Sequence, residues 1–176
     1  SESAQKTIYQ LEQKGVHVHL FKADVSREDE ISGVLKRIAS DMPPLRGIIH
    51  AAGIIDDAVL IRQDMDKFTK VMAPKLKGAW NLHALTRDIV LDFFVCFSST
   101  ASLFGSPGQG NYAAANAYLD ALAHYRRSQG LPGMSINWGP WADAGMAAGM
   151  GKREQMRWVD YGMQTIATDK GLDVLE

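Results

Sequence analysis

Four polar side chains have the types and spacing needed to transfer a proton to a carbonyl oxygen. Tyr112 and Asn116 are four residues apart in a segment of helical pattern, so they lie one turn apart on one helix face. Ser99 precedes Tyr112 by 13 residues, and Lys75 precedes Ser99 by 24. A phenol, with a pKa of about 10, is a poor acid at neutral pH, but a nearby ammonium stabilises the phenolate and lowers that pKa. The set therefore offers a tyrosine acid tuned by a lysine, with a hydroxyl donor beside it.

Each of these side chains also has a simpler interpretation. Tyr112 could be a half-buried packing residue, and Asn116 an ordinary polar residue of a helix. Ser98 is an alternative to Ser99 as the hydroxyl donor, and Ser99 could instead act only as a turn cap. Lys77 competes with Lys75, and either could be a solvated surface lysine. The spacing favours the set named above.

Short apolar runs alternate along the chain with longer segments of helical period. The pattern predicts strands over 16–21, 47–50, 93–97 and 134–137, and helices over about 26–42, 65–87 and 110–128. Pro74 predicts a kink or a first-turn proline in the second helix. Alternating strands and helices indicate βαβ units, and the nearly continuous apolar run 93–97 indicates a sheet covered on both faces. We therefore expect an α/β, Rossmann-like, doubly wound parallel sheet.

Composition narrows the class of protein. The 176 residues are 46% hydrophobic and 22% charged, with a net charge of −1, so bulk charge favours neither nucleic acid nor a membrane surface. No apolar run is long enough to span a bilayer, and the polar start lacks a signal peptide's apolar core. The single cysteine, Cys96, lies in an apolar run and is predicted to be a core residue in a reducing cytoplasm.

Polar and glycine-rich segments follow the predicted strands. They are 23–25, 51–53, 98–100 and 138–140. Because ligands of such sheets bind at the carboxyl ends of the strands, we expect this edge to be the working edge. His17 and His19 alternate on one predicted strand, but no third ligand accompanies them, so no metal site is predicted.

The ordered motifs of this chain resemble the ketoreductase domains of modular type I polyketide synthases, which belong to the extended short-chain dehydrogenase/reductase superfamily. The motifs are His50-Ala51-Ala52-Gly53, Pro74-Lys75, Gly78-Ala79-Trp80-Asn81-Leu82-His83, Phe97-Ser98-Ser99, Gly105-Ser106-Pro107-Gly108-Gln109, Asn111-Tyr112-Ala113-Ala114-Ala115-Asn116 and Asn137-Trp138-Gly139-Pro140-Trp141. Ordinary short-chain dehydrogenases have lysine four residues after the tyrosine. The exchange of lysine and asparagine seen here is the ketoreductase pattern.

The resemblance implies NADPH-dependent reduction of a β-ketoacyl thioester, delivered by an acyl carrier protein among neighbouring polyketide synthase domains. Tyr112 would be the general acid, and Ser99 would polarise the ketone oxygen. Lys75 would tune Tyr112, and Asn116 would orient Lys75 or a proton-relay water. A free-standing dehydrogenase of small carbonyls is an alternative, and the lysine–asparagine exchange argues against it.

The resemblance also implies a set of cofactor-binding residues. In chain order they are Asp24, Val25, His50, Ala51, Ala52, Gly53, Gly139, Pro140 and Trp141. The pair 24–25 would contact adenine, 50–53 would pack along the ribose, and 139–141 would lie beside the nicotinamide amide. Each segment could instead be a tight turn at the end of a strand.

Two parts of the family pattern have no counterpart in the sequence. No glycine-rich phosphate loop precedes Val16, where Gly15 stands alone, and no last strand follows the helix near 169–176. We therefore expect one domain over 1–176 that lacks the first βα unit and the last strand. An alternative is a catalytically inert fragment with a structural or docking role in the synthase.

Ile55-Asp56-Asp57 resembles the Leu-Asp-Asp motif of B-type ketoreductases. Pro107 and Asn111 agree with that type, which implies a D-configured hydroxyl product. The two aspartates could instead only cap the next helix. The methionine-rich region of about 143–165 is predicted to be a lid over the acyl chain, although these methionines could equally fill a core.

Overall fold

The structure is a computed structural model that describes residues 2–142 and 162–175. Its elements are, in chain order, α1 (Glu2–Gln13), α2 (Glu28–Asp41), β1 (Gly47–His50), the 3₁₀ turn η1 (Leu60–Arg62), α3 (Met65–Met72), the π-helical segment η2 (Ala73–Lys77), α4 (Gly78–Thr86), β2 (Phe93–Ser99), α5 (Ala101–Phe104), α6 (Gly110–Ser128), β3 (Met134–Trp138) and α8 (Thr168–Asp173). Within these ranges, no helix combines the length and the apolar character that a membrane span requires.

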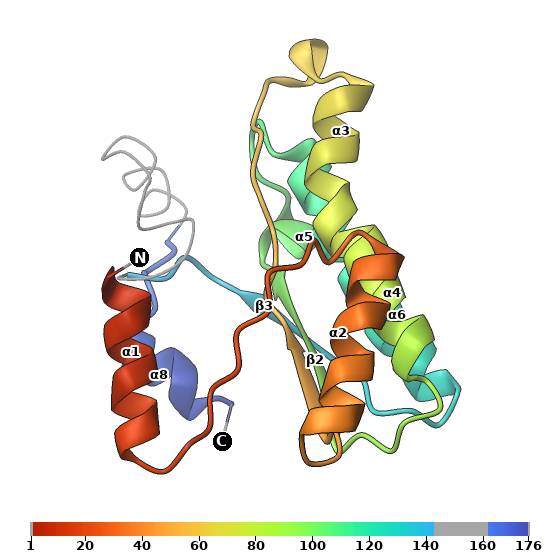
Figure 1. The fold of residues 1–176 in the computed structure, drawn as a ribbon. Helices are drawn as coiled ribbons and strands as arrows, with labels where there is room; N and C mark the ends of the chain where they lie inside the picture. Colours follow the sequence, from red (N-terminus) through yellow and green to blue (C-terminus); the bar gives the residue numbers. More distant parts are fainter. Residues whose placement is uncertain (1, 143–161, 176) are drawn as a thin grey trace.

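The three strands form one parallel sheet in the order β1-β2-β3. Ile48 lies opposite Phe94, and Cys96 lies opposite Ser135. Parallel neighbours need a crossover connection, which α3, η2 and α4 make between β1 and β2, and α5 and α6 make between β2 and β3. Figure 1 shows α4 and α6 together on one side of the sheet. The predicted Rossmann-like α/β fold with a parallel sheet is confirmed.

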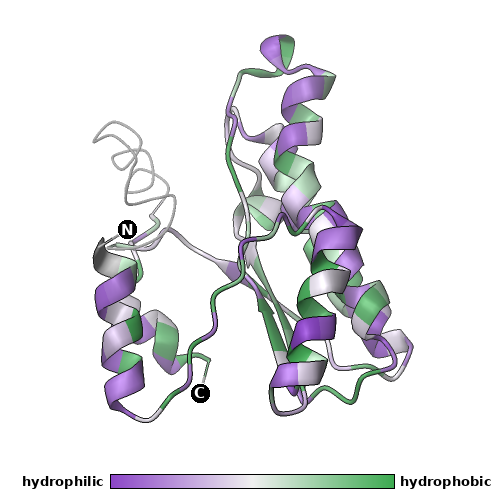
Figure 2. Ribbon diagram, in the orientation of Figure 1, coloured by the Kyte–Doolittle hydropathy of each residue, from purple (hydrophilic) through white to green (hydrophobic). Residues whose placement is uncertain are grey.

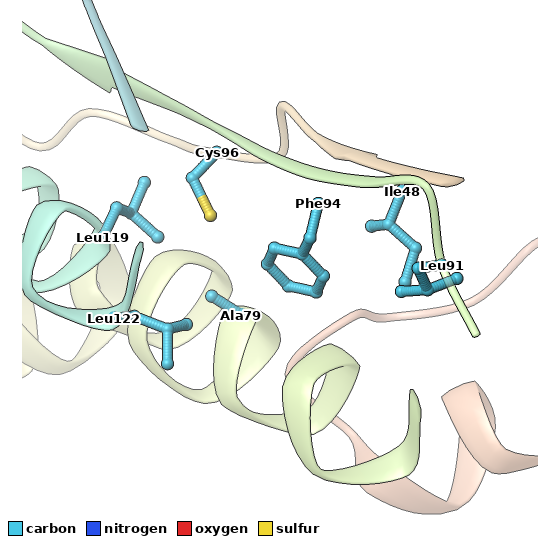
Figure 3. Close-up of a cluster of buried hydrophobic side chains, with 7 residues drawn as sticks. All are labelled: Ile48, Ala79, Leu91, Phe94, Cys96, Leu119 and Leu122. Atoms are coloured by element: carbon cyan, nitrogen blue, oxygen red, sulfur yellow. The ribbon is translucent and has the colours of Figure 1, made fainter. Parts of the chain in front are cut away.

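The hydrophobic core lies between this sheet and helices α4 and α6 (Figure 3). Its buried members are Ile48, Ala79, Leu91, Phe94, Cys96, Leu119 and Leu122. Figure 2 shows hydrophobic colouring along the strands and hydrophilic colouring over much of α1 and α2. Cys96 is a core residue as predicted, and burial raises the pKa of its thiol to about 12.

The other face of the sheet is only partly covered by the residues that the structure describes. Phe93 is 45% exposed, Ile49 53% and Met134 54%. In Figure 1, α1 and α8 stand to the side of the sheet opposite α4 and α6. The expectation of two covered faces is therefore wrong at this end of the sheet, within residues 2–142 and 162–175.

Segment 16–21 was predicted to be a strand, and this prediction is wrong. The segment is extended, but it pairs with no described strand, and Val16 and Leu20 are exposed. A strand needs a neighbour that satisfies its backbone N–H and C=O groups. Alternation of apolar and polar residues shows an extended chain and cannot show whether such a neighbour is present.

Pro74 divides the predicted helix 65–87 into three parts. The chain is α-helical in α3, widens into a π-helical turn in η2, and becomes α-helical again in α4. Proline has no N–H to donate and its ring crowds the preceding turn, so a regular α-helix cannot pass through it unchanged. Single π-helical turns are frequent at functional sites, and this one contains Lys75.

Candidate active site

Lys75 points into the protein from η2. It is 3% exposed, whereas Lys77 in the same segment is exposed, so Lys75 is the lysine that faces the site. Its ammonium donates a hydrogen bond to the Phe97 carbonyl at 2.9 Å and lies 5.7 Å from the centre of the Tyr112 ring. Burial lowers the pKa of Lys75 to about 8, against smaller raising effects of Cys96 and Asp120.

Helix α6 positions Tyr112 and Asn116 on one face. The Asn116 amide donates to the Tyr112 carbonyl at 2.8 Å, and Asn116 is fully buried. Its other amide atom, Oδ1, has no hydrogen-bond partner among the described residues. Ala115 is also fully buried, so the small residues of this segment let the helix lie close to its neighbours. The segment is therefore a packed helix face with one free buried acceptor.

The environment of the Tyr112 hydroxyl differs from the expectation. Burial raises its pKa above the ordinary value, Asp57 raises it further, and hydrogen bonding with Ser99 and Asn116 lowers it. The net direction is upward, opposite to the lowering that the sequence predicted for this phenol. Lys75 Nζ lies over the ring and donates to a backbone carbonyl, so desolvation of the phenol dominates.

Ser99 is the last residue of β2 and Ser98 is its neighbour. Successive strand residues point to opposite faces. Ser98 is buried, and its hydroxyl donates to the Asn116 carbonyl at 3.2 Å. The Ser99 hydroxyl interacts with Tyr112 and also accepts from the Ala101 N–H at 3.2 Å, so it caps a turn as well. The structure thus brings Lys75, Tyr112, Ser99 and Asn116 together.

Asp24 and Val25 lie on a loop against α4. The Val25 carbonyl accepts from the Asn81 amide at 3.1 Å. The Asp24 carboxylate is exposed and accepts from the Ser26 N–H and hydroxyl. A Cβ at Gly78 would lie 2.7 Å from Val25 Cγ1, so only glycine lets this loop approach α4 so closely. The loop is held in place although it does not end a strand.

The His50 side chain is buried at the end of β1. The ring is 3% exposed, and its Nε2 has no partner among the described residues. Burial lowers the pKa of His50 to about 4, Lys75 lowers it as well, and a hydrogen bond with the Pro74 backbone opposes both. The buried His50 ring therefore lies near enough to Lys75 for the ammonium to affect its pKa. Ala51 and Ala52, which follow β1, are exposed.

Segment 139–141 follows β3 and is tied to the chain after residue 161. The Ile166 N–H donates to the Pro140 carbonyl at 2.8 Å, and the Ala142 N–H donates to the Ile166 carbonyl at 2.9 Å. The Trp141 ring lies 4.8 Å from the Trp138 ring and touches Gly171 of α8. These contacts hold the segment at the same sheet edge as Ser99.

The residues at this edge fit the nicotinamide and ribose half of a dinucleotide. Ala51 and Ala52 are small and exposed at the end of β1, so a ligand can approach their backbone closely. The free Oδ1 of Asn116 is a buried acceptor beside Tyr112. Within residues 2–142 and 162–175 there is no group of three or more His, Cys, Asp or Glu that could hold a metal ion.

The residues predicted to set the configuration of the product hydroxyl are Asp56, Asp57, Pro107 and Asn111. All except the exposed Pro107 belong to one connected group. Asp56 pairs with Lys67 and Lys70, each at 2.8 Å, and hydrogen bonds from these lysines lower its pKa to about 2. The Asn111 amide donates to the Asp56 carbonyl at 2.9 Å and accepts from the Tyr112 N–H at 2.8 Å. This asparagine therefore connects the loop to the start of α6.

The capping alternative for the two aspartates is wrong. The N-cap of α3 is Asp64, whose side chain accepts from the Lys67 N–H at 2.8 Å. Asp57 instead accepts from the Gln109 amide at 2.9 Å and lies near enough to Tyr112 to affect its pKa. The predicted lid, 143–165, lies outside the described residues except for 162–165.

Sequence reasoning missed a polar cluster behind Ser99. Asp120 of α6 accepts hydrogen bonds from Ser102, Ser135 and Asn137. The signal was present in the spacing, because Asp120 lies four residues after Asn116 and eight after Tyr112, on the same helix face. No rule of composition distinguishes such a residue from a solvated helix aspartate.

Comparison with known proteins connects this geometry to a family. The family model described as KR domain matches residues 1–143. The chain is 39% identical over its full length to the phenolphthiocerol synthesis polyketide synthase type I Pks15/1 of Mycobacterium marinum, and 42% identical over 95% of its length to the polyketide synthase GfsB of Streptomyces halstedii. It spans only 8% and 3% of those two proteins.

Solved structures agree with the fold. The chain superimposes with a TM-score of 0.92 on an A-type ketoreductase from a modular polyketide synthase, at 39% sequence identity. The superposition covers 99% of this chain and 36% of the ketoreductase chain. A ketoreductase domain from the bacillaene assembly line gives a TM-score of 0.91 at 35% identity, over 99% of this chain and 43% of that one. The chain therefore belongs to the KR-domain family, the ketoreductase domains of polyketide synthases.

Proposed function

We propose that this chain carries the catalytic part of a domain that reduces a β-ketoacyl thioester to a β-hydroxyacyl thioester with NADPH. The observation that carries the proposal is the meeting of Lys75, Tyr112 and Ser99, from three separate segments, at the carboxyl edge of the sheet. NADPH, when bound, supplies the hydride that adds to the ketone carbon. Ala51, Ala52 and segment 139–141 would hold its nicotinamide half.

Tyr112 donates the proton that the ketone oxygen needs. Burial keeps the pKa of Tyr112 above its ordinary value, so the phenol is protonated at neutral pH. The Ser99 hydroxyl donates a hydrogen bond to the ketone oxygen and holds it near the phenol. Lys75, with a pKa of about 8, is mostly charged at neutral pH and stabilises the phenolate that remains after proton transfer.

The substrate reaches this site as a thioester on an acyl carrier protein, with other polyketide synthase domains as neighbours. The two curated relatives described above are polyketide synthases far longer than this chain, which supports a multidomain setting. The cytoplasm suits a chain whose single cysteine is buried and reduced.

The product hydroxyl is D-configured, as in B-type enzymes. Support comes from Ile55-Asp56-Asp57 and from the contacts that place Asp57 beside Gln109 and near Tyr112. Two similar solved structures are those of an A-type and an A1-type ketoreductase, so this assignment depends on these loop residues and not on the overall fold. Chiral chromatography of the released product tests it, and an L-configured hydroxyl would reject it.

Tyr112→Phe tests the reaction directly, because it removes only the hydroxyl oxygen. In the full polypeptide, reduction of a β-ketoacyl thioester should fall at least about a hundredfold. Tyr125→Phe is the matched control, since it makes the same change on the exposed part of α6 and should keep full activity. Equal NADPH consumption by the two variants would refute the assignment.

NADPH titration by fluorescence separates this proposal from the inert docking role. Tyr112→Phe should bind NADPH as the unsubstituted protein does, because the lost hydroxyl acts on the ketone. A polypeptide that binds no NADPH and reduces no ketone would favour the docking role.

A further inference from the structure

Asp120 is the centre of a polar cluster that the proposed reaction does not use. Its carboxylate accepts from the Ser135 hydroxyl at 2.5 Å, the Ser102 hydroxyl at 2.7 Å and the Asn137 amide at 2.9 Å. These donors come from β3 and α5, so one carboxylate of α6 joins three elements. A carboxylate with three donors is a strong, charge-assisted connection.

The cluster continues to the backbone of Ser99. Ser102 Oγ lies 2.9 Å from the Ser99 carbonyl oxygen, and Asn137 Nδ2 lies 3.4 Å from the same oxygen. Ser102 has one hydroxyl proton, which either the Asp120 carboxylate or the Ser99 carbonyl accepts. The Asn137 amide donates to Ser102 Oγ at 2.8 Å. The Ser98 hydroxyl adds a link from β2 to the Asn116 carbonyl.

We propose that Asp120 is a positioning residue for ketone reduction: it holds the end of β2, which carries Ser99, against the helix that carries Tyr112 and Asn116. The inference rests on the proposed function, because it matters only if these side chains meet the ketone. Asp120 acts through Ser102, Ser135 and Asn137 and does not touch the substrate.

The charge of Asp120 gives this role a second effect. Burial raises the pKa of its carboxyl, but the hydrogen bonds from Ser135, Ser102 and Asn137 together outweigh burial and bring this pKa below its ordinary value. The carboxyl is therefore ionised at neutral pH. The ionised carboxylate favours the ammonium of Lys75.

Other groups face these two charges. Cys96 of β2 and the Tyr112 ring of α6 face Lys75, as does the neutral His50 of β1. On the side of Asp120, His124 and Arg127 line the same surface pocket. The Arg127 guanidinium contacts His124 at 2.8 Å and the Gly133 carbonyl at 2.6 Å.

Asp120→Asn tests the proposal in the full polypeptide, with NADPH and a β-ketoacyl N-acetylcysteamine thioester as the probe. Asparagine keeps the size but has one acceptor atom where three donors meet. We expect kcat to fall about ten- to a hundredfold, because a small misplacement of the reacting groups slows the chemical step by that order. KM for NADPH should stay unchanged. The alkaline limb of the kcat profile, set by the Lys75 ammonium, should move to lower pH.

Asp88→Asn is the matched control, because Asp88 has a side chain that is 90% exposed and it pairs only loosely with Arg87. It should change neither kcat nor the pH limb. The proposal is overturned if Asp120→Asn keeps the wild-type kcat, or loses kcat with the alkaline limb in place, even where its melting temperature falls.

Two further variants keep the test decisive. If Asp120→Asn does not fold, Ser102→Ala removes one link between Asp120 and Ser99, and an unchanged kcat in that variant would overturn the proposal. Tyr112→Phe separates the two ideas. If it is active, the proposed function fails, whereas an inactive Tyr112→Phe beside a normal Asp120→Asn rejects only the positioning role.

Discussion

Replacing Lys75 by methionine should stabilise the fold and abolish ketone reduction. Lys75 is 3% exposed, and burial lowers the pKa of its ammonium from 10.5 to about 8. That drop corresponds to a cost of about 3 kcal/mol for holding the charge inside the folded chain. Methionine also loses the hydrogen bond to the Phe97 carbonyl, which reduces the gain from removing the charge by about 1 kcal/mol. The expected net gain in the free energy of unfolding is about 2 kcal/mol at pH 7.

The gain should depend on pH in a defined direction. Below about pH 8, Lys75 is charged in the folded and the unfolded chain, so its cost is present in full. Between about pH 8 and 10.5 the unfolded chain binds more protons than the folded one, so the wild type gains stability relative to the variant as pH rises. The difference between the two proteins should therefore shrink toward pH 10.5.

Urea unfolding of the complete ketoreductase domain at pH 7 and pH 10 measures this difference, because effects of other titrating groups cancel between variant and wild type. Lys77→Met, in the same segment but exposed, is the control and should change neither stability nor activity. A Lys75→Met domain that is less stable than the wild type at pH 7, or whose advantage is the same at both pH values, would refute the reasoning.

Three further predictions concern the cofactor loop, the core and the pH profile. Gly78→Ala puts a Cβ 2.7 Å from Val25 Cγ1, so it should displace the Asp24–Val25 loop and raise KM for NADPH more than it lowers kcat in steady-state kinetics. Leu119→Ala opens a cavity at a fully buried position and should cost about 2–5 kcal/mol in urea unfolding; a cost below about 1 kcal/mol would contradict its place in the core. The wild-type kcat should fall as pH rises through about 8, where the Lys75 ammonium loses its proton, and a flat profile to pH 9 would contradict this.

Much of the fold could be predicted because its strands are short apolar runs with turn residues on both sides. The predicted strands 47–50, 93–97 and 134–137 and the predicted helix 110–128 agree with β1, β2, β3 and α6. Two errors have a common cause. The extended segment 16–21 has no described pairing partner, and Phe93 lies half exposed on a face expected to be covered. Both depend on neighbours, which local patterns do not contain.

The sequence alone determined which chemical groups are available and how they are ordered: a phenol and an amide one helical turn apart, a serine at a strand end, and lysines around a proline. These follow from residue type and helical or strand period, which are local properties. Tertiary structure decided that Lys75 and not Lys77 enters the site, because within the π-helical segment η2 only Lys75 is buried against the rest of the fold. It also raised the pKa of Tyr112, where the sequence predicted a lower pKa, and it placed Asp120 behind Ser99. Burial and hydrogen bonding arise between segments far apart in the chain, so only the packed fold determines them.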